Sequence, residues 1–505
     1  MPLQRPTSKL VLLGVIILSL LGFGYSLFGN LYRRSPDLVS PPCLKSAPVA
    51  SSRTFYVDPI RGTDAGNGSV ERPWRNLQRI IDAKLVGSQF AETPIYQYWI
   101  ARILGTQPTA RIYDNPDSIV GDGDTILLAT GDYGPLNLRG IINRAPITIS
   151  GAPGANARFS QILMEGTAHF AFKDFEVSSK AWATGTRHLV NMRPEPRARR
   201  SNGISFSGLR VGGQDSIANL TPEQWAKNSN NGFLMFGDCL NIDKSKVHDV
   251  HIGVSLYHVT KALVSNNEIH DYSVDGIDFS GNDIVIRNNV IRDHWPTGDA
   301  LHPDCMQGQS TPHNPTFGPV LIEHNVCLSD TSARHSKRLQ GINIFDGKWV
   351  DVKVECNFVR PTIAHGISMY GVNSATIANN IVIGWPDAPT APWISSMPSK
   401  EGRYPVANLI TNNQSTAYLN AVHGAPFPHA EMIKNLRVNM NDPQILQMLS
   451  VPISGVRLVK NEWLSPAWDL SGDTRFKPLQ RPTYNAIISV EQAKADLAAL
   501  PGCAS

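Results

Sequence analysis

The sequence predicts an all-β fold, a right-handed parallel β-helix in which short strands stack coil upon coil into a solenoid. Two observations predict it. A strand–corner–strand pattern recurs between residues 230 and 385, and a second polar and apolar element recurs between its copies. A solenoid grows by adding coils, so a chain of 505 residues can form one continuous unit.

The first repeated pattern is a strand, a tight corner that carries asparagine, and another strand. Its copies are Val264–Ile269, Ile286–Ile291, Ile322–Val326, Val354–Phe358 and Ile377–Ile381. Asparagine tolerates the left-handed backbone that a sharp corner requires. Since identical amides in stacked coils can hydrogen-bond to one another, we expect a ladder of asparagine side chains.

The second element recurs as Ile252–Ser255, Asp275–Asp278, Asp304–Gln307, Gln340–Asn343 and His365–Ser368. Corner spacings run from 22 residues (Asn267 to Asn289) to 36 residues (Asn289 to Asn325), as expected for one coil with variable loops. Successive side chains of a strand point to opposite faces, so aligned copies form columns. We expect an apolar column in the core (Val254, Ile277, Met306, Ile342, Ile367) and two polar columns facing outward (Ser255, Asp278, Gln307, Asn343, Ser368; and Ile252, Asp275, Asp304, Gln340, His365).

These copies resemble the pectin-lyase-like superfamily of right-handed parallel β-helix repeat proteins, over about residues 54–425. The resemblance implies the fold and a carbohydrate polymer as ligand. It does not select the chemistry, because the superfamily contains polysaccharide lyases, uronate epimerases, glycoside hydrolases and phage tailspikes. The string from His302 to Gln307 looks like a motif of bacterial β-helix proteins related to lyases and epimerases. The Gly-His-Gly and Arg-Ile-Lys strings of polygalacturonases are missing, and so is the Asp-Pro-His string of alginate epimerases.

The N-terminus predicts export and membrane attachment. Leu10 to Phe28 is an uncharged, mainly apolar run of 19 residues with basic residues on both sides, so we expect residues 1–34 to be a signal-anchor with a transmembrane helix at 10–28. Its length and the lack of an A-x-A cleavage site favour retention over removal. Residues 35–53 read as a linker, and the main domain is expected outside the cytoplasm.

The remaining chain divides into a β-helix at 54–429 and a C-terminal cap region at 430–505. A helix near residues 73–81 is expected to plug the N-terminal end of the solenoid, residues 84–118 to form a partly helical insertion, and residues 485–500 to form a capping helix. The six cysteines lack C-x-x-C spacing, which argues against a zinc or iron–sulfur site. They permit disulfides, including one between Cys43 and Cys503 that would join the two ends of the chain. The alternative is that they are buried as small apolar residues.

Candidate site residues gather on the outward columns and the segment before them. The predicted catalytic residues are His302, Asp304, Asp278, Lys348 and His365; the predicted substrate-binding residues are Asp275, Asp299, Gln307, Asn343, Asp346 and Tyr370. Clustered carboxylates raise one another's pKa or recruit a cation, so Ca²⁺ is the one candidate cofactor, although none is certain. For each residue taken singly, a solvated polar face is the simpler interpretation.

Three functions remain open, and the balance leans toward an enzyme. A lyase or epimerase of a uronate polymer would use His302 as base, Asp304 and Asp278 as acids or Ca²⁺ ligands, and Lys348 to neutralise the uronate. A glycoside hydrolase would use two of Asp275, Asp278, Asp299 and Asp304. A structural surface protein would bind carbohydrate without turnover. Trp295, Phe345, Trp349, Tyr370 and Trp385 could stack on sugars or pack against loops.

Charge and motifs exclude other classes. The formal net charge of +4 comes without a dense basic block, so nucleic acid is not an expected partner. The sequence contains neither a phosphate-binding P-loop nor a G-x-S-x-G hydrolase elbow. The expected partners are a polysaccharide and, through residues 10–28, a membrane.

Overall fold

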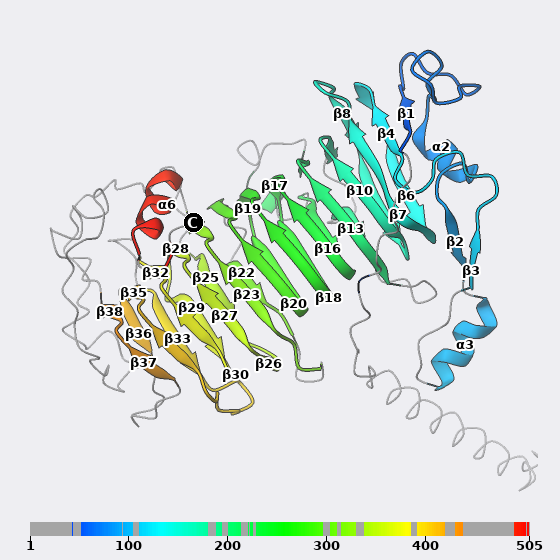
Figure 1. Cartoon of the computed structure of the whole chain (residues 1–505). Coiled ribbons are helices and arrows are strands. Elements are labelled where there is room, and N and C mark those ends of the chain that lie inside the picture. The colour runs from blue at the N-terminus through cyan, green and yellow to red at the C-terminus, as the bar shows by residue number, and fades with distance from the viewer. Residues whose placement is uncertain are drawn as a thin grey trace, which may run out of the picture.

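The computed structural model shows an elongated stack of parallel strands (Figure 1). It describes residues 43, 52–92, 94–104, 111–179, 188–193, 200–213, 221, 223–225, 229–295, 303–310, 315–329, 338–384, 391–419, 430–437, 489–500 and 502–503. The predicted membrane segment 10–28 therefore lies outside the described residues, as do Asp299, His302 and Trp385. Within the described ranges, no helix is both long and apolar enough to cross a membrane.

Each coil contributes strands to three faces. The strands that lead into the corners form the first face: β1 (Thr54–Val57), β4 (Thr125–Leu128), β7 (Ile141–Gly151), β10 (Ala168–Lys173), β13 (Ser201–Ser207), β16 (Gly237–Asp243), the second parts of β18 (Val254–Ser265) and β20 (Ile277–Arg287), β23 (Val320–Glu323), β27 (Val352–Glu355), β31 (Thr376–Ala378), β34 (Leu409–Thr411) and β37 (Glu431–Ile433). We call this face the first sheet.

The strands that leave the corners form a 12-stranded sheet, here the second sheet: β5 (Gly131–Asp132), β8 (Ala157–Phe159), β11 (Glu176–Ser179), β14 (Arg210–Gly213), β17 (Lys246–Val250), β19 (Glu268–Tyr272), β21 (Val290–His294), β24 (Val326–Leu328), β28 (Phe358–Arg360), β32 (Ile381–Val382), β35 (Gln414–Ser415) and β38 (Leu436–Arg437).

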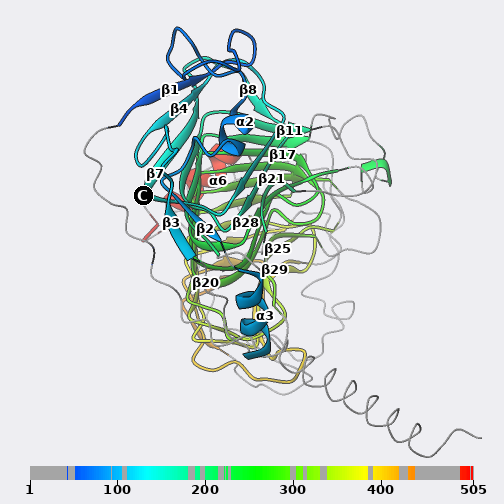
Figure 2. The ribbon, with the colours of Figure 1, turned by 90° about the vertical axis from the view of Figure 1, so that its right-hand side faces the viewer.

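The third sheet closes each coil. It contains β6 (Pro135–Arg139), β9 (Gln161–Glu165), β12 (His188–Met192), β15 (Asn231–Met235), the first parts of β18 and β20, β22 (Asp304–Gly308), β25 (Gln340–Ile344), β29 (His365–Tyr370), β33 (Trp393–Met397) and β36 (Ala417–Leu419). A short pair, β26 (Trp349–Val350) and β30 (Val372–Asn373), lies outside these three sheets. Figure 2 views the stack from its N-terminal end.

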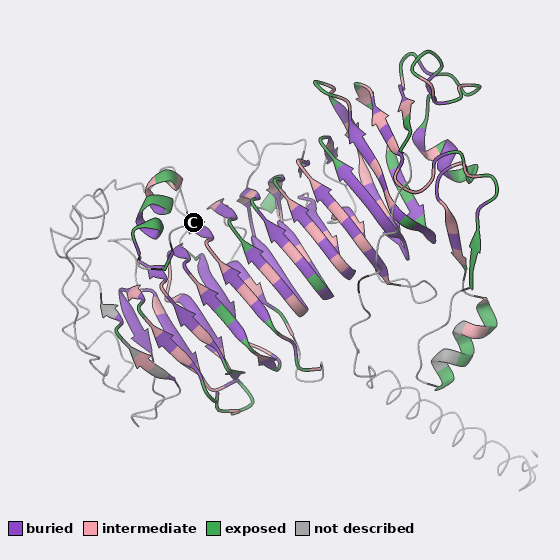
Figure 3. Ribbon diagram, in the orientation of Figure 1, coloured by how far each residue is buried: buried purple, intermediate pink, exposed green. Residues whose placement is uncertain are grey.

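The columns predicted from the repeats are confirmed. Val254 pairs with Ile277, Ile277 with Met306, Met306 with Ile342, and Ile342 with Ile367, and all five are buried in one continuous core. The polar residue that follows each of them pairs in the same register. This outward column is only partly exposed, because Asp278, Asn343 and Ser368 are buried, whereas Ser255 and Gln307 are half-buried. Figure 3 shows how burial alternates along the strands.

The predicted asparagine ladder is also confirmed, and it is longer than the sequence indicated. The amide nitrogen of each ladder residue donates to the amide oxygen of the next at 2.9–3.0 Å, through Asn267, Asn289, Asn325, Asn357, Asn380, Asn413 and Asn435. The left-handed backbone belongs to the residue before the ladder position, such as Asn266 or Asn288, both at φ 56°. In a corner with two asparagines, the first therefore adopts the left-handed backbone and the second forms the ladder.

The N-terminal end is covered as predicted. Helix α2 (Leu77–Asp82) begins at Asn76, whose side chain accepts a hydrogen bond from the Arg79 amide, and it buries Leu77, Ile80 and Ile81 against the core. The insertion contains an antiparallel pair, β2 (Gln89–Glu92) and β3 (Arg111–Asp114), with helix α3 (Ile95–Leu104) between them. Helix α3 projects beyond the coils in Figure 1.

The C-terminal helix α6 (Val490–Ala498) lies on the side of the solenoid rather than over its end, contrary to the predicted cap. It packs Ala493 and Leu497 onto an apolar stripe on the outer side of the second sheet that includes Val326 and Phe358. Coil strands continue through Arg437, beyond the boundary predicted at residue 429.

Three disulfides join Cys43 to Cys239, Cys305 to Cys327, and Cys356 to Cys503. The suggested Cys43–Cys503 pairing is therefore wrong. Cys356 replaces a corner asparagine, so Cys503 fixes the chain just after α6 to the corner of one coil. None of the six cysteines is free.

Candidate active site on the third sheet

Three aspartates come together where the chain enters the third sheet. Asp275 and Asp278 lie in one coil, and their carboxyl groups are hydrogen-bonded to each other. Asp304 lies in the next coil, and its backbone amide donates to Oδ1 of Asp275 at 2.8 Å. The exposed fractions are 3%, 7% and 0%, so all three carboxyls are nearly shielded from solvent. Asp275 and Asp304 are 29 positions apart in the sequence. They become neighbours because β20 and β22 pair in register in the third sheet.

Amide side chains from the following coil border this cluster. Asn343 donates through Nδ2 to Oδ1 of Asp304, and the same nitrogen lies 3.4 Å from Oε1 of Gln340. Gln307 pairs with both Asp278 and Asn343 in the polar column and is only half-buried. The cluster therefore offers neutral hydrogen-bonding groups on the side toward the C-terminal coils.

Burial controls the protonation of the aspartates. It raises the pKa of Asp275 to about 6, and it raises the pKa of Asp278 and of Asp304 well above the usual value, with the negative charge of Asp275 adding to the effect at both. The hydrogen bond between the pair raises the pKa of Asp278 and acts to lower that of Asp275. Asp278 is therefore the carboxyl that holds the shared proton and donates it to Asp275. None of the three forms an ion pair with a lysine or arginine of the described ranges.

Two buried carboxyl oxygens, Oδ1 of Asp278 and Oδ2 of Asp304, have no hydrogen-bond partner in the part of the chain that the structure describes. The same holds for Oδ1 of Asn343. Leaving such groups unpaired costs free energy, so they are available for a ligand that brings donors or acceptors of its own.

An aromatic cluster lies beside the acids. The ring of His365 contacts Phe345 at 4.9 Å, Trp393 at 5.0 Å and Tyr370 at 6.1 Å between centroids, all near a right angle. Nδ1 of His365 is 3.1 Å from Oγ of Ser368. These four rings are half-buried, in contrast to the aspartates, so they form the accessible rim of the site. Aromatic faces are the surfaces on which sugar rings stack.

The other predicted residues lie elsewhere. Lys348 is exposed in the turn between β25 and β26. Asp346 occupies the same turn, where Lys400 lies 2.8 Å from its Oδ1. Trp349, considered as a sugar-stacking residue, is buried in the core against Phe279 and Phe317.

Two neighbours of the cluster were not predicted. Trp393 comes after the last repeat that the sequence shows, yet it pairs with His365 across β29 and β33. Tyr272 at the end of β19 is fully buried, and burial together with the charges of Asp275 and Asp304 raises the pKa of its hydroxyl. The sequence did contain a signal for its location, because Tyr272 lies only three residues before Asp275.

Within the described ranges, no group of three or more histidine, cysteine, aspartate or glutamate side chains is arranged to hold a metal ion. The carboxyls of Asp275 and Asp278 are joined by a side-chain hydrogen bond.

Residues 231–388 match a family model described as "Right handed beta helix region". Similar solved structures include the A-module of mannuronan C-5 epimerase AlgE6 from Azotobacter vinelandii, with 15% identity, TM-score 0.45 and coverage of 64% of this chain and 89% of that one. Pectate lyase Pel9A has 11% identity and TM-score 0.37 over 82% and 91% of the two chains, and the Dettilon tailspike protein 14% and 0.41 over 62% of each.

No curated protein sequence matches this chain significantly. The matched region covers coils whose strands are parallel and share one core. The described coils form a parallel β-helix, as their corners and columns predict, and the matched residues 231–388 lie within it.

Proposed function

We propose that this protein acts on a uronate-containing polysaccharide by elimination or epimerisation at the outer side of the third sheet. The observation that carries the proposal is the juxtaposition of proton-holding aspartates, neutral amides and an aromatic rim that includes a histidine. The rim residues Phe345, Tyr370 and Trp393 would hold sugar rings through stacking, with the aspartates next to the bound chain.

Removing the hydrogen at C5 of a uronate places negative charge on the neighbouring carboxylate, so that carboxylate must be neutralised. A carboxylate close to ionised aspartates would be repelled. The protonated carboxyl of Asp278 and the amide of Asn343 avoid this repulsion, because both can donate a hydrogen bond without carrying a negative charge. Lys348, assigned this role from sequence, lies exposed in a turn and would have to reach across to contribute.

The remaining step needs a base. His365 lies on the rim, and its imidazole is the base that we propose takes the C5 proton; His302, the other candidate, is outside the described residues. Elimination follows if the electron pair expels the oxygen at C4, which takes a proton from an acid such as Asp304. Epimerisation follows if a proton returns to C5 from the opposite side.

Glycoside hydrolysis is the second candidate. The raised pKa of Asp278 and of Asp304 is what a general acid requires to protonate a glycosidic oxygen near neutral pH. Such an enzyme would release reducing ends without an unsaturated product, so the same assay separates the two.

We also propose that residues 10–28 hold the protein at a membrane with the β-helix on the outer side. The length and apolar character of this stretch support the proposal. Partition of the full chain into the membrane fraction, and its release when residues 1–34 are deleted, would be the expected results; a full chain that stays in the soluble fraction would contradict it.

The activity test incubates the full chain in mild detergent with alginate, polygalacturonate and a neutral glucan, with and without Ca²⁺. Ultraviolet absorbance reports the unsaturated product, a reducing-end assay reports hydrolysis, and exchange of the C5 hydrogen in heavy water reports epimerisation. We expect Asp278→Asn and Asp304→Asn to lower turnover by roughly 100-fold or more, since acid–base groups contribute that much.

Asp351→Asn is the matched control, because it makes the same change at an exposed turn remote from the cluster. It should retain full turnover. Binding of a polysaccharide without any product from the unaltered protein would overturn the enzyme proposal and leave a carbohydrate-binding surface protein.

A further inference from the structure

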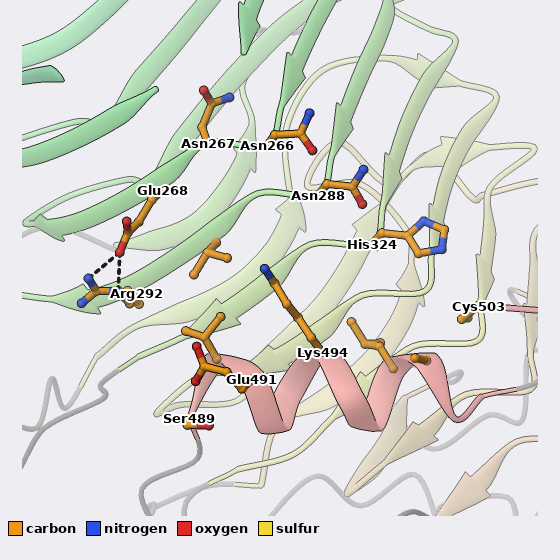
Figure 4. A pocket seen from close by; sticks show the side chains of 14 residues that line it. Asn266, Asn267, Glu268, Asn288, Arg292, His324, Ser489, Glu491, Lys494 and Cys503 are labelled. Atoms are coloured by element: carbon orange, nitrogen blue, oxygen red, sulfur yellow. Dashed lines mark hydrogen bonds and ion pairs between the residues drawn. The ribbon is translucent and has the colours of Figure 1, made fainter. Parts of the chain in front are cut away.

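A second concave site lies on another edge of the solenoid. Between α6 and the corners that join the first and second sheets is a cavity of about 880 Å³, a volume typical of small-ligand sites (Figure 4). It is lined by none of the aspartates of the candidate active site. The third sheet forms a different face of each coil, so the two sites are separate.

Stacked corners build one wall of this cavity. Asn266, Asn288 and His324 occupy the same left-handed corner position in three successive coils, at φ 55–56°. Adjacent strands lie about 4.8 Å apart, so the three polar side chains form a regularly spaced row. Cys356 has the next position in this row, and its disulfide to Cys503 fixes the adjoining chain and closes that end.

Helix α6 provides the opposite wall. Lys494 extends from the helix into the space between the helix and the corners, as Figure 4 shows. Among the described residues, the ammonium of Lys494 and the side-chain amide of Asn288 have no hydrogen-bond or ion-pair partner. Val290 and Leu497 add an apolar strip to the lining.

The charges of the lining are balanced. Arg292 is engaged by Glu268, with Nη2 and Oε1 2.6 Å apart, and it also contacts Asp293. Glu491 lies on the same helix one turn before Lys494 and is influenced by its charge. A strongly anionic ligand would meet two carboxylates, and a cation would meet Lys494 and Arg292. Neither charge sign is favoured, whereas amide, imidazole and ammonium groups suit hydroxyl groups.

We propose that this cavity is a second carbohydrate-binding site, which takes a short neutral stretch of a saccharide chain. A sugar ring has a rim of hydroxyls and an apolar C–H face, and the cavity presents a polar row opposite an apolar strip. Such a site would hold a polysaccharide on the side of the solenoid without acting on it.

The test measures binding of cellopentaose and mannopentaose to the full chain by calorimetry, and by nuclear magnetic resonance of the bound sugar. Inorganic phosphate and oligogalacturonate serve as anionic probes. Asn288→Gly keeps a residue that tolerates the left-handed corner but removes the amide, and Lys494→Met removes the charge at similar length. Each should weaken binding of the neutral sugar about fivefold to tenfold, as expected for one lost hydrogen bond.

Asn412→Gly is the matched control, because Asn412 occupies the same exposed corner position at φ 53° in a coil that does not line the cavity. It should leave the affinity unchanged. Tight binding of the anionic probes in place of the neutral sugars, no binding of any probe, or equal effects of Asn288→Gly and Asn412→Gly would each overturn the inference. Loss of enzymatic turnover would not bear on it.

Discussion

The carboxyls of Asp275 and Asp278 show how a single residue acquires a property that its type does not have. In water both would be ionised at neutral pH. In the third sheet they are buried and in contact, so ionising both would place two like charges side by side in a poorly solvated place. The shared proton removes one of these charges and leaves Asp278 as a hydrogen-bond donor.

This arrangement makes stability fall as pH rises. Below the ordinary pKa of 3.8, the carboxyls are protonated in both the folded and the unfolded chain. Above it the unfolded chain loses its protons first, so folding becomes less favourable until the pH passes the folded pKa, which is about 6 for Asp275 and is raised well above the usual value for Asp278 and Asp304. The stability present at acidic pH is therefore partly lost toward neutral and alkaline pH.

Asp278→Asn should remove much of this loss, because an amide can donate to Asp275 as the protonated acid does but never ionises. We expect the free energy of unfolding of the variant to exceed that of the unaltered protein by roughly 1–3 kcal/mol at about pH 8, and to match it near pH 4. Urea unfolding across this range measures the difference. Asp351→Asn should show no such pH-dependent gain, and a constant difference for Asp278→Asn would contradict the shared proton.

At the scale of the element, a column of small residues shapes the entry into the third sheet. Gly253, Gly276, Gly341 and Gly366 are the second residues of the repeated element, and a side chain added to any of them would meet an isoleucine or valine of the second sheet at 2.3–2.7 Å. In one coil Cys305 takes the glycine position and Cys327 takes the aliphatic position. The disulfide thus replaces a glycine–aliphatic contact that neighbouring coils make.

The double variant Cys305→Gly/Cys327→Val should therefore fold normally, because it restores the pair found in adjacent coils. We expect it to lose only the contribution of the cross-link, about 3 kcal/mol for a loop of 22 residues. Cys327→Val alone should be less stable than the double variant, because the side chain of Cys305 would crowd the valine. Urea unfolding of the three proteins tests this order, and a double variant less stable than the single one would refute the equivalence.

At the scale of the whole molecule, the sequence predicted what each coil repeats and missed what joins distant coils. The corners and columns from Asn267 to Ser368 were predictable because their signals, asparagine and alternating apolar residues, lie within each coil. Earlier coils lacked that signal, since Asp174 and Gly208 occupy their left-handed corners. The placement of α6, the burial of the acids and the cysteine pairs depend on contacts between residues far apart in the chain, which no local pattern contains.

The cysteine pairs connect the whole molecule across long sequence separations, 196 residues for Cys43–Cys239 and 147 for Cys356–Cys503. Such bonds form and persist where the surroundings are oxidising, which agrees with the proposed location of the β-helix outside the cytoplasm. Protein from its native cells, denatured without reductant and treated with a maleimide, should take up no label; after reduction it should take up one label on each of its six cysteines. Blocking thiols with acid at lysis prevents later exchange. Six labels before reduction would mean that the chain resides in a reducing compartment, which would contradict the proposed location. The Cys356–Cys503 disulfide would then not contribute to holding α6 on the second sheet.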